Sequence, residues 1–260
     1  MKKTPVRSAA AKILLFDLET APNLGYVWAK WEQDVIDFEK GWYVLSFAYK
    51  WLGEKTIITH ALPDYKTWKR DKEDDYELVQ ELWRLFDEAN IIVAHNGDAF
   101  DIKKSNQRFI VHRLGPPSPY KSYDTLKAAR RIASNNSNKL DDLGAVYNLG
   151  RKLPHTGKHL WFGCMKGDNA AWKTMRAYNA QDVALLEKLY LLLKPWDKSH
   201  PNINIFSRVL KACPSCGQQK LNKRGFEYNK GGEMQRYQCL NCFKWSTDKS
   251  EPLANKITIR

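Results

Sequence analysis

The chain has 260 residues, of which 43% are hydrophobic and 12% aromatic, enough for one well-buried domain with a small appendage. This composition excludes global disorder, and no apolar run is long enough to span a bilayer. The formal net charge of +13 favours nucleic acid as a partner, because lysines and arginines gain affinity by releasing counterions from phosphates. An anionic membrane would attract the same charge, but no basic amphipathic helix supports that interpretation, so we expect no membrane partner.

The first three quarters of the chain alternate strand-like and helix-like patterns. Strands are predicted at 13–18, 44–51, 56–61 and 91–94, and helices at 74–89, 101–114, 124–131, 139–147 and 176–193. Pro22 and Gly25 predict a loop after the first strand, and Pro195 ends the last helix. This order predicts an α/β layered domain whose mixed sheet is flanked by helices.

A second domain of different composition is predicted after a polar stretch between Pro195 and Pro201. Residues 199–260 hold 11 lysines and arginines against 4 aspartates and glutamates, whereas residues 1–198 hold 31 against 25. More than half of the excess positive charge therefore lies in less than a quarter of the chain. We expect domains at 1–198 and 199–260, the second being strongly basic.

Three short motifs in the first domain supply four carboxylates. Asp17 and Glu19 in FDLET leave the same face of the first strand, because side chains alternate along a strand. Asp101 in HNGDAFD starts a helix just after a strand, and Asp182 in YNAQD lies one helical turn after Tyr178. Such a cluster would repel itself unless hard divalent cations were bound between its members. We expect it to hold two Mg²⁺ or Mn²⁺ ions that promote phosphodiester hydrolysis.

Each motif alone also has an ordinary structural explanation. An acidic pair on a strand is usually a solvated edge, and HNGDAFD fits a plain turn before a helix. A tyrosine and an aspartate four residues apart fit an ordinary helix surface. The three motifs in this order and in these contexts are far less expected by chance, so we predict that they form one site.

The set FDLET, HNGDAFD and YNAQD resembles the three exonuclease motifs of the DEDD superfamily of 3′→5′ exonucleases. Tyr178 places the resemblance in the tyrosine branch, and the middle motif is similar to that of the exonuclease domain of family B DNA polymerases. The resemblance covers about Lys12 to Trp196. It implies an RNase H-like fold, two metal ions held by the four carboxylates, and removal of nucleotides from a free 3′ end. It also implies that Tyr178 orients the attacking water, a role that suits a side chain with an unperturbed pKa near 10.

The function we expect is metal-dependent hydrolysis from the 3′ end of single-stranded or frayed DNA. DNA is preferred over RNA because the motif resemblance is to a proofreading domain. An RNA exonuclease and an RNase H-like endonuclease remain as enzymatic alternatives. A nucleic-acid-binding adaptor without catalysis is the alternative from another class, but the presence of all four acids gives it no support. The sequence predicts no particular protein partner.

Five residues near the motifs are candidate substrate contacts: Thr20, Asn96, Phe100, Lys139 and His155. Asn96 would hydrogen-bond the substrate backbone and Phe100 would stack on a base, although a turn residue and a core residue are equally expected there. Thr20 fits a loop as well as a nucleotide contact. Lys139 and His155 would meet phosphates, although a capped, solvated helix start explains that segment slightly better. Basic residues that would form one side of a groove, unless they are merely solvated, are Arg130, Arg131, Arg151, Lys152 and Lys158.

Four of the five cysteines form two CxxC pairs, and these predict one tetrahedral zinc site. The pairs are Cys213 with Cys216 and Cys239 with Cys242, separated by 22 residues. An iron–sulfur cluster or redox disulfides fit the hairpin-like pattern between the pairs poorly. Cysteines arranged for metal binding indicate a reducing compartment, so we expect a cytoplasmic location. The unpaired Cys164 is expected to be a small apolar residue.

The segment around the cysteine pairs resembles a zinc ribbon. A unit this small has too little core to fold alone, so the single Zn²⁺ is expected to be structural. Aromatic and basic residues are interleaved along it, which suits contact with nucleic acid. Docking on the catalytic domain or on a protein partner is the alternative.

Overall fold

The computed structural model describes residues 10–31, 34–207, 209, 211–229 and 232–248. Within them the chain forms two compact units, one from Lys12 to Tyr190 and one that continues from Leu191. Each unit has a sheet of its own and is described by itself. The assignment of an exonuclease domain to 1–198 and of a basic ribbon domain to 199–260 stays a prediction.

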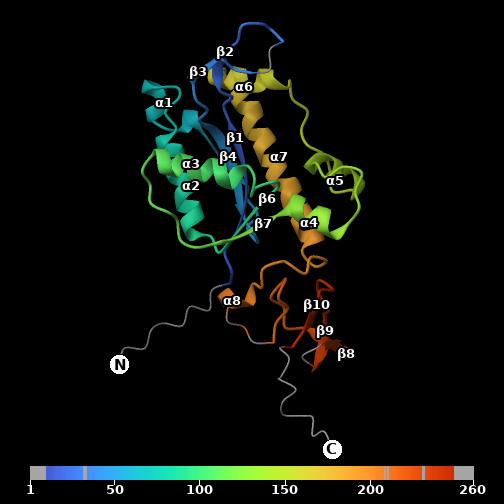
Figure 1. The fold of residues 1–260 in the computed structure, drawn as a ribbon. Coiled ribbons are helices and arrows are strands. Elements are labelled where there is room, and N and C mark those ends of the chain that lie inside the picture. Colours follow the sequence, from blue (N-terminus) through green and yellow to red (C-terminus); the bar gives the residue numbers. More distant parts are fainter. Residues whose placement is uncertain (1–9, 32–33, 208, 210, 230–231, 249–260) are drawn as a thin grey trace, which may run out of the picture. The chain divides into compact units, whose positions relative to one another are not determined.

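A five-stranded mixed sheet forms the centre of the first unit, in the order β5-β4-β1-β6-β7 (Figure 1). Its strands are β1 (Ile13–Thr20), β4 (Val44–Trp51), β5 (Ile58–Ala61), β6 (Ile91–Ala94) and β7 (Lys121–Asp124). β4 is antiparallel to β1 and to β5, whereas β6 is parallel to β1 and to β7. The predicted mixed sheet is confirmed. β7 was not predicted, because it is only four residues long and half of it is exposed.

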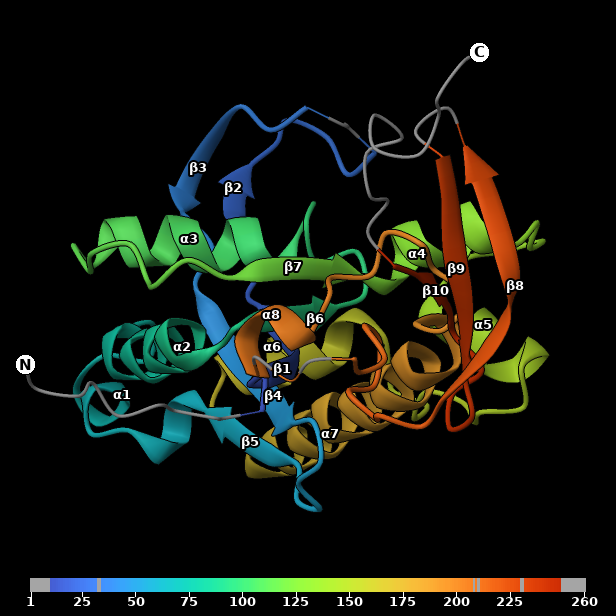
Figure 2. The same cartoon turned by 90° about the horizontal axis from the view of Figure 1, so that it is seen from below.

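Helices cover both faces of this sheet (Figures 1 and 2). They are α1 (Thr67–Arg70), α2 (Tyr76–Glu88), α3 (Asp101–Val111), α4 (Thr125–Ile132), α5 (Leu140–Val146), α6 (Lys158–Met165) and α7 (Asn169–Leu193), with a 3₁₀ turn at Leu62–Asp64. α4 corresponds to the helix predicted at 124–131, and Asp124 caps it by accepting hydrogen bonds from the amides of Leu126 and Lys127. α6 was not predicted, since it is only eight residues long and its many apolar residues show no clear alternation with polar ones. Among the described helices, none is both long and apolar enough to cross a membrane.

The alternation of side chains along β1 gives its two faces different partners. On one face Phe16 packs edge-on against Phe86 of α2, with ring centroids 5.1 Å apart. On the opposite face Asp17 accepts a hydrogen bond from Asn179 of α7. Because residues 13–16 are all buried, β1 is held from both sides and positions Asp17 rigidly at the end of the buried run.

A two-stranded antiparallel arm follows β1, where the sequence predicted a loop (Figure 2). Its strands are β2 (Leu24–Tyr26) and β3 (Asp37–Lys40). Gly25 allows the close approach at the base of the arm, because a Cβ there would lie 2.5 Å from Cγ1 of Val35. The side chains of both strands are exposed, so the arm has no buried face that an alternating sequence pattern would reveal.

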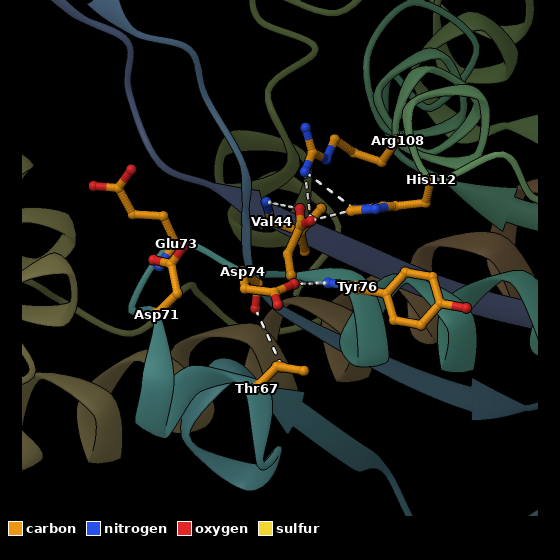
Figure 3. Close-up of polar contacts among 9 residues, drawn as sticks. Val44, Thr67, Asp71, Glu73, Asp74, Tyr76, Arg108 and His112 are labelled. Atoms are coloured by element: carbon orange, nitrogen blue, oxygen red, sulfur yellow. Dashed lines mark hydrogen bonds and ion pairs between the residues drawn. The ribbon is translucent and has the colours of Figure 1, made fainter.

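The buried carboxylate of Asp75 ties α3 to the sheet. Figure 3 labels its partners Val44, Arg108 and His112. It accepts a hydrogen bond from the amide of Val44 at 2.8 Å and pairs with Arg108 at 2.5 Å and His112 at 2.6 Å. Burial opposes the charge of Asp75, but the bonds from His112 and Arg108 outweigh burial and lower its pKa. Because α3 begins with Asp101, this contact also fixes the element that carries one of the predicted site residues.

The second unit contains a three-stranded antiparallel sheet in the order β10-β9-β8. Its elements are α8 (Asn204–Ser207), β8 (Leu221–Asn229), β9 (Gly232–Cys239) and β10 (Trp245–Thr247). A bulge interrupts β8 between Lys223 and Phe226, where Gly225 has a φ of 65°. The predicted architecture is confirmed: a mixed sheet with flanking helices, and a small sheet that carries four cysteines.

Candidate active site and metal centres

Three carboxylates from distant segments meet in the first unit. Asp17 and Glu19 of β1 and Asp182 of α7 each place an oxygen atom within 4.8 Å of the others. The β1–β4 ladder shifts register immediately after Glu19, an irregularity of the kind found beside active sites. Asp182 is almost completely buried, with 1% of its surface exposed. The structure thus brings these three predicted residues together.

Asp101, the fourth predicted carboxylate, lies in the first turn of α3 beside this group. β6 pairs with β1 only as far as Leu15, and beyond that point the amide of Leu18 donates to Oδ1 of Asp101 at 3.2 Å. Burial raises the pKa of Asp101 well above its usual value, and the charge of Asp17 raises it further. Asp101 is therefore an electrostatic neighbour of Asp17, although its carboxylate lies outside the closest group of three.

The acidic side chains raise one another's pKa. Burial, followed by the charge of Asp182, raises the pKa of Asp17 to about 7. Burial, followed by Asp17, raises the pKa of Glu19 well above its usual value, and burial also raises that of Asp182. Carboxylates behave in this way when they gather without enough positive charge, and a divalent cation would relieve the repulsion.

Lys152 supplies one positive charge to the group. Its ammonium lies 2.7 Å from Oδ2 of Asp182 and donates to the hydroxyl of Tyr178 at 2.7 Å. Burial opposes the charge of Lys152, but Asp182 and Tyr178 outweigh burial and raise its pKa. Within the described chain, Oδ1 of Asp182 is buried without a hydrogen-bond partner. This unpaired atom and the all-oxygen donor set fit a hard divalent cation such as Mg²⁺ or Mn²⁺.

Two further side chains hold the carboxylates in position. Nδ2 of Asn179 donates to Oδ2 of Asp17 at 2.7 Å, and the hydroxyl of Ser46 in turn donates to Oδ1 of Asn179 at 2.5 Å. Nε1 of Trp161 in α6 donates to Oε2 of Glu19 at 2.9 Å. The sequence did not indicate these roles, since the bonded residues are 162 and 142 positions apart.

Aromatic rings form a wall beside the carboxylates. The ring centroid of His155 lies 4.9 Å from that of Tyr178 and 5.2 Å from that of Trp161. Burial, followed by the charge of Asp182, raises the pKa of Tyr178, so its hydroxyl stays protonated at neutral pH. His155 borders the site, as the sequence suggested, and its Nδ1 accepts a hydrogen bond from the amide of Gly157.

The family model of the RNase H superfamily matches residues 39–194, a range that includes Asp101, Tyr178 and Asp182. The chain belongs to the RNase H superfamily. A family B DNA polymerase from the hyperthermophilic archaeon Pyrobaculum calidifontis has a similar fold, with a TM-score of 0.50 and 16% identity over 85% of this chain. The chain spans 31% of that polymerase's length. No curated protein matched the sequence.

The other predicted contacts have different local surroundings in this RNase H superfamily member. Asn96 has a φ of 65°, and its amide donates to Oδ1 of Asp124, so it has the turn geometry that the sequence allowed. Phe100 is not a core residue, because 39% of its surface is exposed. Lys139 is exposed at the start of α5, where its amide donates to the hydroxyl of Ser137. Their roles in substrate binding stay predictions.

A cavity of about 400 Å³ opens next to the carboxylates. Its lining includes Thr20, which follows Glu19 in β1, and Trp161, which bonds to Glu19. Trp42 and Lys104 form another part of the lining, and the ammonium of Lys104 lies 3.6 Å from the Trp42 ring centroid. An aromatic and basic lining of this kind suits a nucleotide.

The four paired cysteines come together in the second unit. Their sulfur atoms all lie within 4.8 Å of one another, with 3.5 Å between Cys213 and Cys242 and 3.6 Å between Cys216 and Cys239. A tetrahedral ion with Zn–S bonds of about 2.3 Å separates its sulfurs by about 3.8 Å. The donor set and the spacing therefore fit a structural zinc ion. Cys164 is buried in the first unit as a small apolar residue.

Two buried lysines accompany the four cysteines. Lys194 and Lys244 are 7% and 8% exposed, and both interact electrostatically with Cys213 and Cys242. The ammonium of Lys244 also donates to the carbonyl oxygen of Asp197 at 2.6 Å. Zn²⁺ with four thiolates has a net charge of −2, which these two ammonium groups offset.

Proposed function

We propose that this protein is a metal-dependent 3′→5′ exonuclease that hydrolyses single-stranded DNA from its 3′ end. The main support is the meeting of Asp17, Glu19 and Asp182 within 4.8 Å, with Asp101 as an electrostatic neighbour of Asp17. Buried carboxylates that repel one another destabilise a fold, and such strongly perturbed groups concentrate at functional sites. Membership of the RNase H superfamily supports phosphodiester hydrolysis as that function.

Each carboxylate has a distinct place in the proposed site. When bound, two divalent cations activate a water and stabilise the leaving oxygen in an in-line displacement at phosphorus. Asp17 interacts electrostatically with Asp182 and with Asp101, so it is the residue suited to contact both cations. Glu19 and Asp182 would complete one ligand set, and Asp101 would complete the other.

Tyr178 and Lys152 complement the acids with a hydrogen bond and a positive charge. Because Tyr178 stays protonated, it does not act as a general base, and its hydroxyl would instead orient the attacking water. The ammonium of Lys152 bonds to that hydroxyl and lies against Asp182. It would stabilise the negative charge that grows on the phosphate oxygens during displacement.

The choice of substrate rests on motifs, charge and the nearby cavity. The exonuclease motifs and the fold shared with a family B DNA polymerase support DNA and a 3′ end. The net charge of +13 supports a polyanion, and the lining of Trp42, Lys104 and Trp161 supports unpaired bases. The paired cysteines support a reducing, cytoplasmic location.

Digestion of oligonucleotides labelled at the 5′ end tests this function. DNA and RNA, single- and double-stranded, would each be incubated with magnesium, manganese or a chelator. We expect a ladder that shortens from the 3′ side, release of mononucleotides, preference for single-stranded DNA, and no reaction with the chelator. Cleavage of a circular single strand, which has no 3′ end, would refute the exonuclease and show that the protein is an endonuclease. Absence of any cleavage in magnesium and manganese would refute the enzyme and favour the alternative of a nucleic-acid-binding adaptor without catalysis.

A further inference from the structure

We propose that the second unit carries a separate binding groove for single-stranded nucleic acid, beside its four-cysteine site. The choice of nucleic acid as the ligand rests on the proposed function. The groove has a volume of about 700 Å³ and lies between the end of α7 and the second cysteine pair. Residues that line it include Leu192, Trp196, Lys198, Phe243 and Trp245.

Three aromatic residues of the groove are unusually exposed. Trp196 is 72% exposed, Phe243 67% and Trp245 49%. Large rings left in water on a small unit do not contribute much to its core, and several of them together mark a binding surface. Bases of a single strand stack on such rings whatever their sequence, because every base has a π face.

The two cysteine turns have equivalent positions at Gly217 and Phe243. The backbone at this position suits glycine, so the fold does not by itself explain the phenylalanine. In each turn the residue after the second cysteine has a left-handed backbone, with φ of 74° at Gly217 and 61° at Phe243. The amides of Gly217 and Phe243 donate to Cys213 and Cys239 in the same way, at 2.9 and 3.0 Å. Glycine adopts this conformation without strain, whereas phenylalanine does so at a cost in free energy. We infer that the Phe243 ring offsets that cost by binding a ligand.

The charge of the second unit favours a polyanion over a protein as that ligand. Residues 191–248 contain ten lysines and arginines against four aspartates and glutamates. Lys194 and Lys244 are buried next to the thiolates, which leaves the exposed cations to act on a ligand. Of these, Lys198 lines the groove, and the guanidinium of Arg236 lies 5.6 Å from the Trp245 ring centroid. Positive charge beside stacking rings is the arrangement that single strands bind.

The affinity of the full-length, zinc-loaded protein for 5′-fluorescein-labelled (dT)₁₂ and (rU)₁₂ tests the groove. Fluorescence anisotropy would be measured without added magnesium or manganese, so that the strands stay intact. We expect Trp196→Ala and Phe243→Gly each to weaken binding about tenfold. Tyr228→Ala is the matched control, because Tyr228 is a 72% exposed aromatic of β8 that does not line the groove. Its affinity should stay within about twofold of the unmodified protein.

Phe243→Gly also separates a binding role from a structural one. Glycine relieves the left-handed strain, so we expect an unchanged or higher midpoint of thermal unfolding together with the weaker binding. A lower midpoint with reduced zinc content would show that the ring is structural and overturn the inference. Lys198→Gln gives an independent measure, since removal of one phosphate contact should reduce the slope of log K against log salt by about 0.7. An unchanged slope would count against the groove.

Failure of this inference is distinguishable from failure of the proposed function. Hydrolysis of a 5′-labelled trinucleotide in magnesium reports on the acidic site, and we expect Tyr228→Ala, which does not line the groove, to leave its rate within about twofold. If the unmodified protein does not hydrolyse the trinucleotide, the exonuclease proposal is refuted. The affinities for (dT)₁₂ and (rU)₁₂ would then still test the groove. Equal affinity of the unmodified protein and of all three groove variants would refute the groove, whatever the hydrolysis shows.

Discussion

The acidic site and the four-cysteine site both suit cations, but the chain assembles them in different ways. The acidic residues come from β1, α3 and α7, elements whose packing in a large core fixes their positions. The cysteines come from two local turns on a small sheet, and in its strand β9 only Gly232 and Cys239 are buried. The comparison indicates that the first unit forms its site before any ion binds, whereas the second needs its ion in order to fold.

The two sites also differ in charge balance before and after a metal ion binds. The acidic site concentrates negative charge that Lys152 only partly offsets, so it destabilises the unit in the absence of divalent cations. In the four-cysteine site the two buried ammonium groups of Lys194 and Lys244 match the charge of a zinc tetrathiolate. Removal of one carboxylate charge should therefore stabilise the first unit, whereas loss of the zinc ion should unfold the second.

The largest expected effect is that of zinc on the second unit. Cys239→Ser should abolish zinc binding, which supplies about 10 kcal/mol or more of folding free energy in small zinc domains. Proteolysis should then degrade the chain beyond α7 while the first unit keeps its cooperative thermal transition. Metal analysis and limited proteolysis would measure both. Cys164→Ser is the matched control, because it should keep the zinc and destabilise only the first unit. Survival of the second unit without zinc would contradict the comparison.

Asp17→Asn should separate activity from stability in the first unit. We expect nuclease activity to fall at least about a thousandfold, because the carboxylate suited to contact both cations is lost. The midpoint of thermal unfolding should rise, since a buried like charge disappears while an amide oxygen still accepts from Asn179. Glu54→Gln, a change at an exposed loop position, is the control and should alter neither quantity. A lower unfolding midpoint for Asp17→Asn would show that the acids do not repel one another in the folded protein.

Local sequence predicted the acidic residues because each motif combines a chemical type with a recognisable backbone context. Asp17 and Glu19 end an apolar run, and Asp101 starts a helix shortly after a buried strand. The two cysteine pairs could also be recognised from local sequence alone, because each pair lies within four residues. The main strands and helices of the first unit followed from the same periodicity, although α7 begins at Asn169 and not at the predicted position 176.

The roles of residues that bond to partners far away in the chain could not be predicted from the sequence. Trp161 reaches Glu19 from α6, a short helix that the sequence did not predict. Lys152 was suggested only as part of a basic groove, because nothing in a loop indicates which carboxylate a lysine will meet. The arm after β1 was missed for the opposite reason, since its exposed strands have no apolar face to recognise.

Asp75→Asn tests how much the buried ion pair that joins α3 to the sheet contributes to stability. Removal of one partner from this buried ion pair should cost about 3 kcal/mol of stability at neutral pH, measured by urea unfolding. The folded pKa of Asp75 is lowered, so its contribution is complete above its unfolded pKa of about 3.9 and is lost as the pH falls through the folded value. The difference in stability between the two proteins should therefore shrink at low pH. A difference that stays constant down to pH 2 would exclude this ion pair as its cause.

The smallest effect is expected at Tyr178, which lies against the acidic cluster but is not one of its carboxylates. Tyr178→Phe keeps the ring beside His155 and removes the hydroxyl that bonds to Lys152. Activity in magnesium should fall about tenfold, the effect of one lost hydrogen bond, while the magnesium concentration for half-maximal activity stays the same. A loss as deep as that of Asp17→Asn, or a shift in magnesium dependence, would mean that the tyrosine helps to form the cation site. Unchanged activity would remove it from the mechanism, and the orientation of the attacking water would then fall to the carboxylates alone.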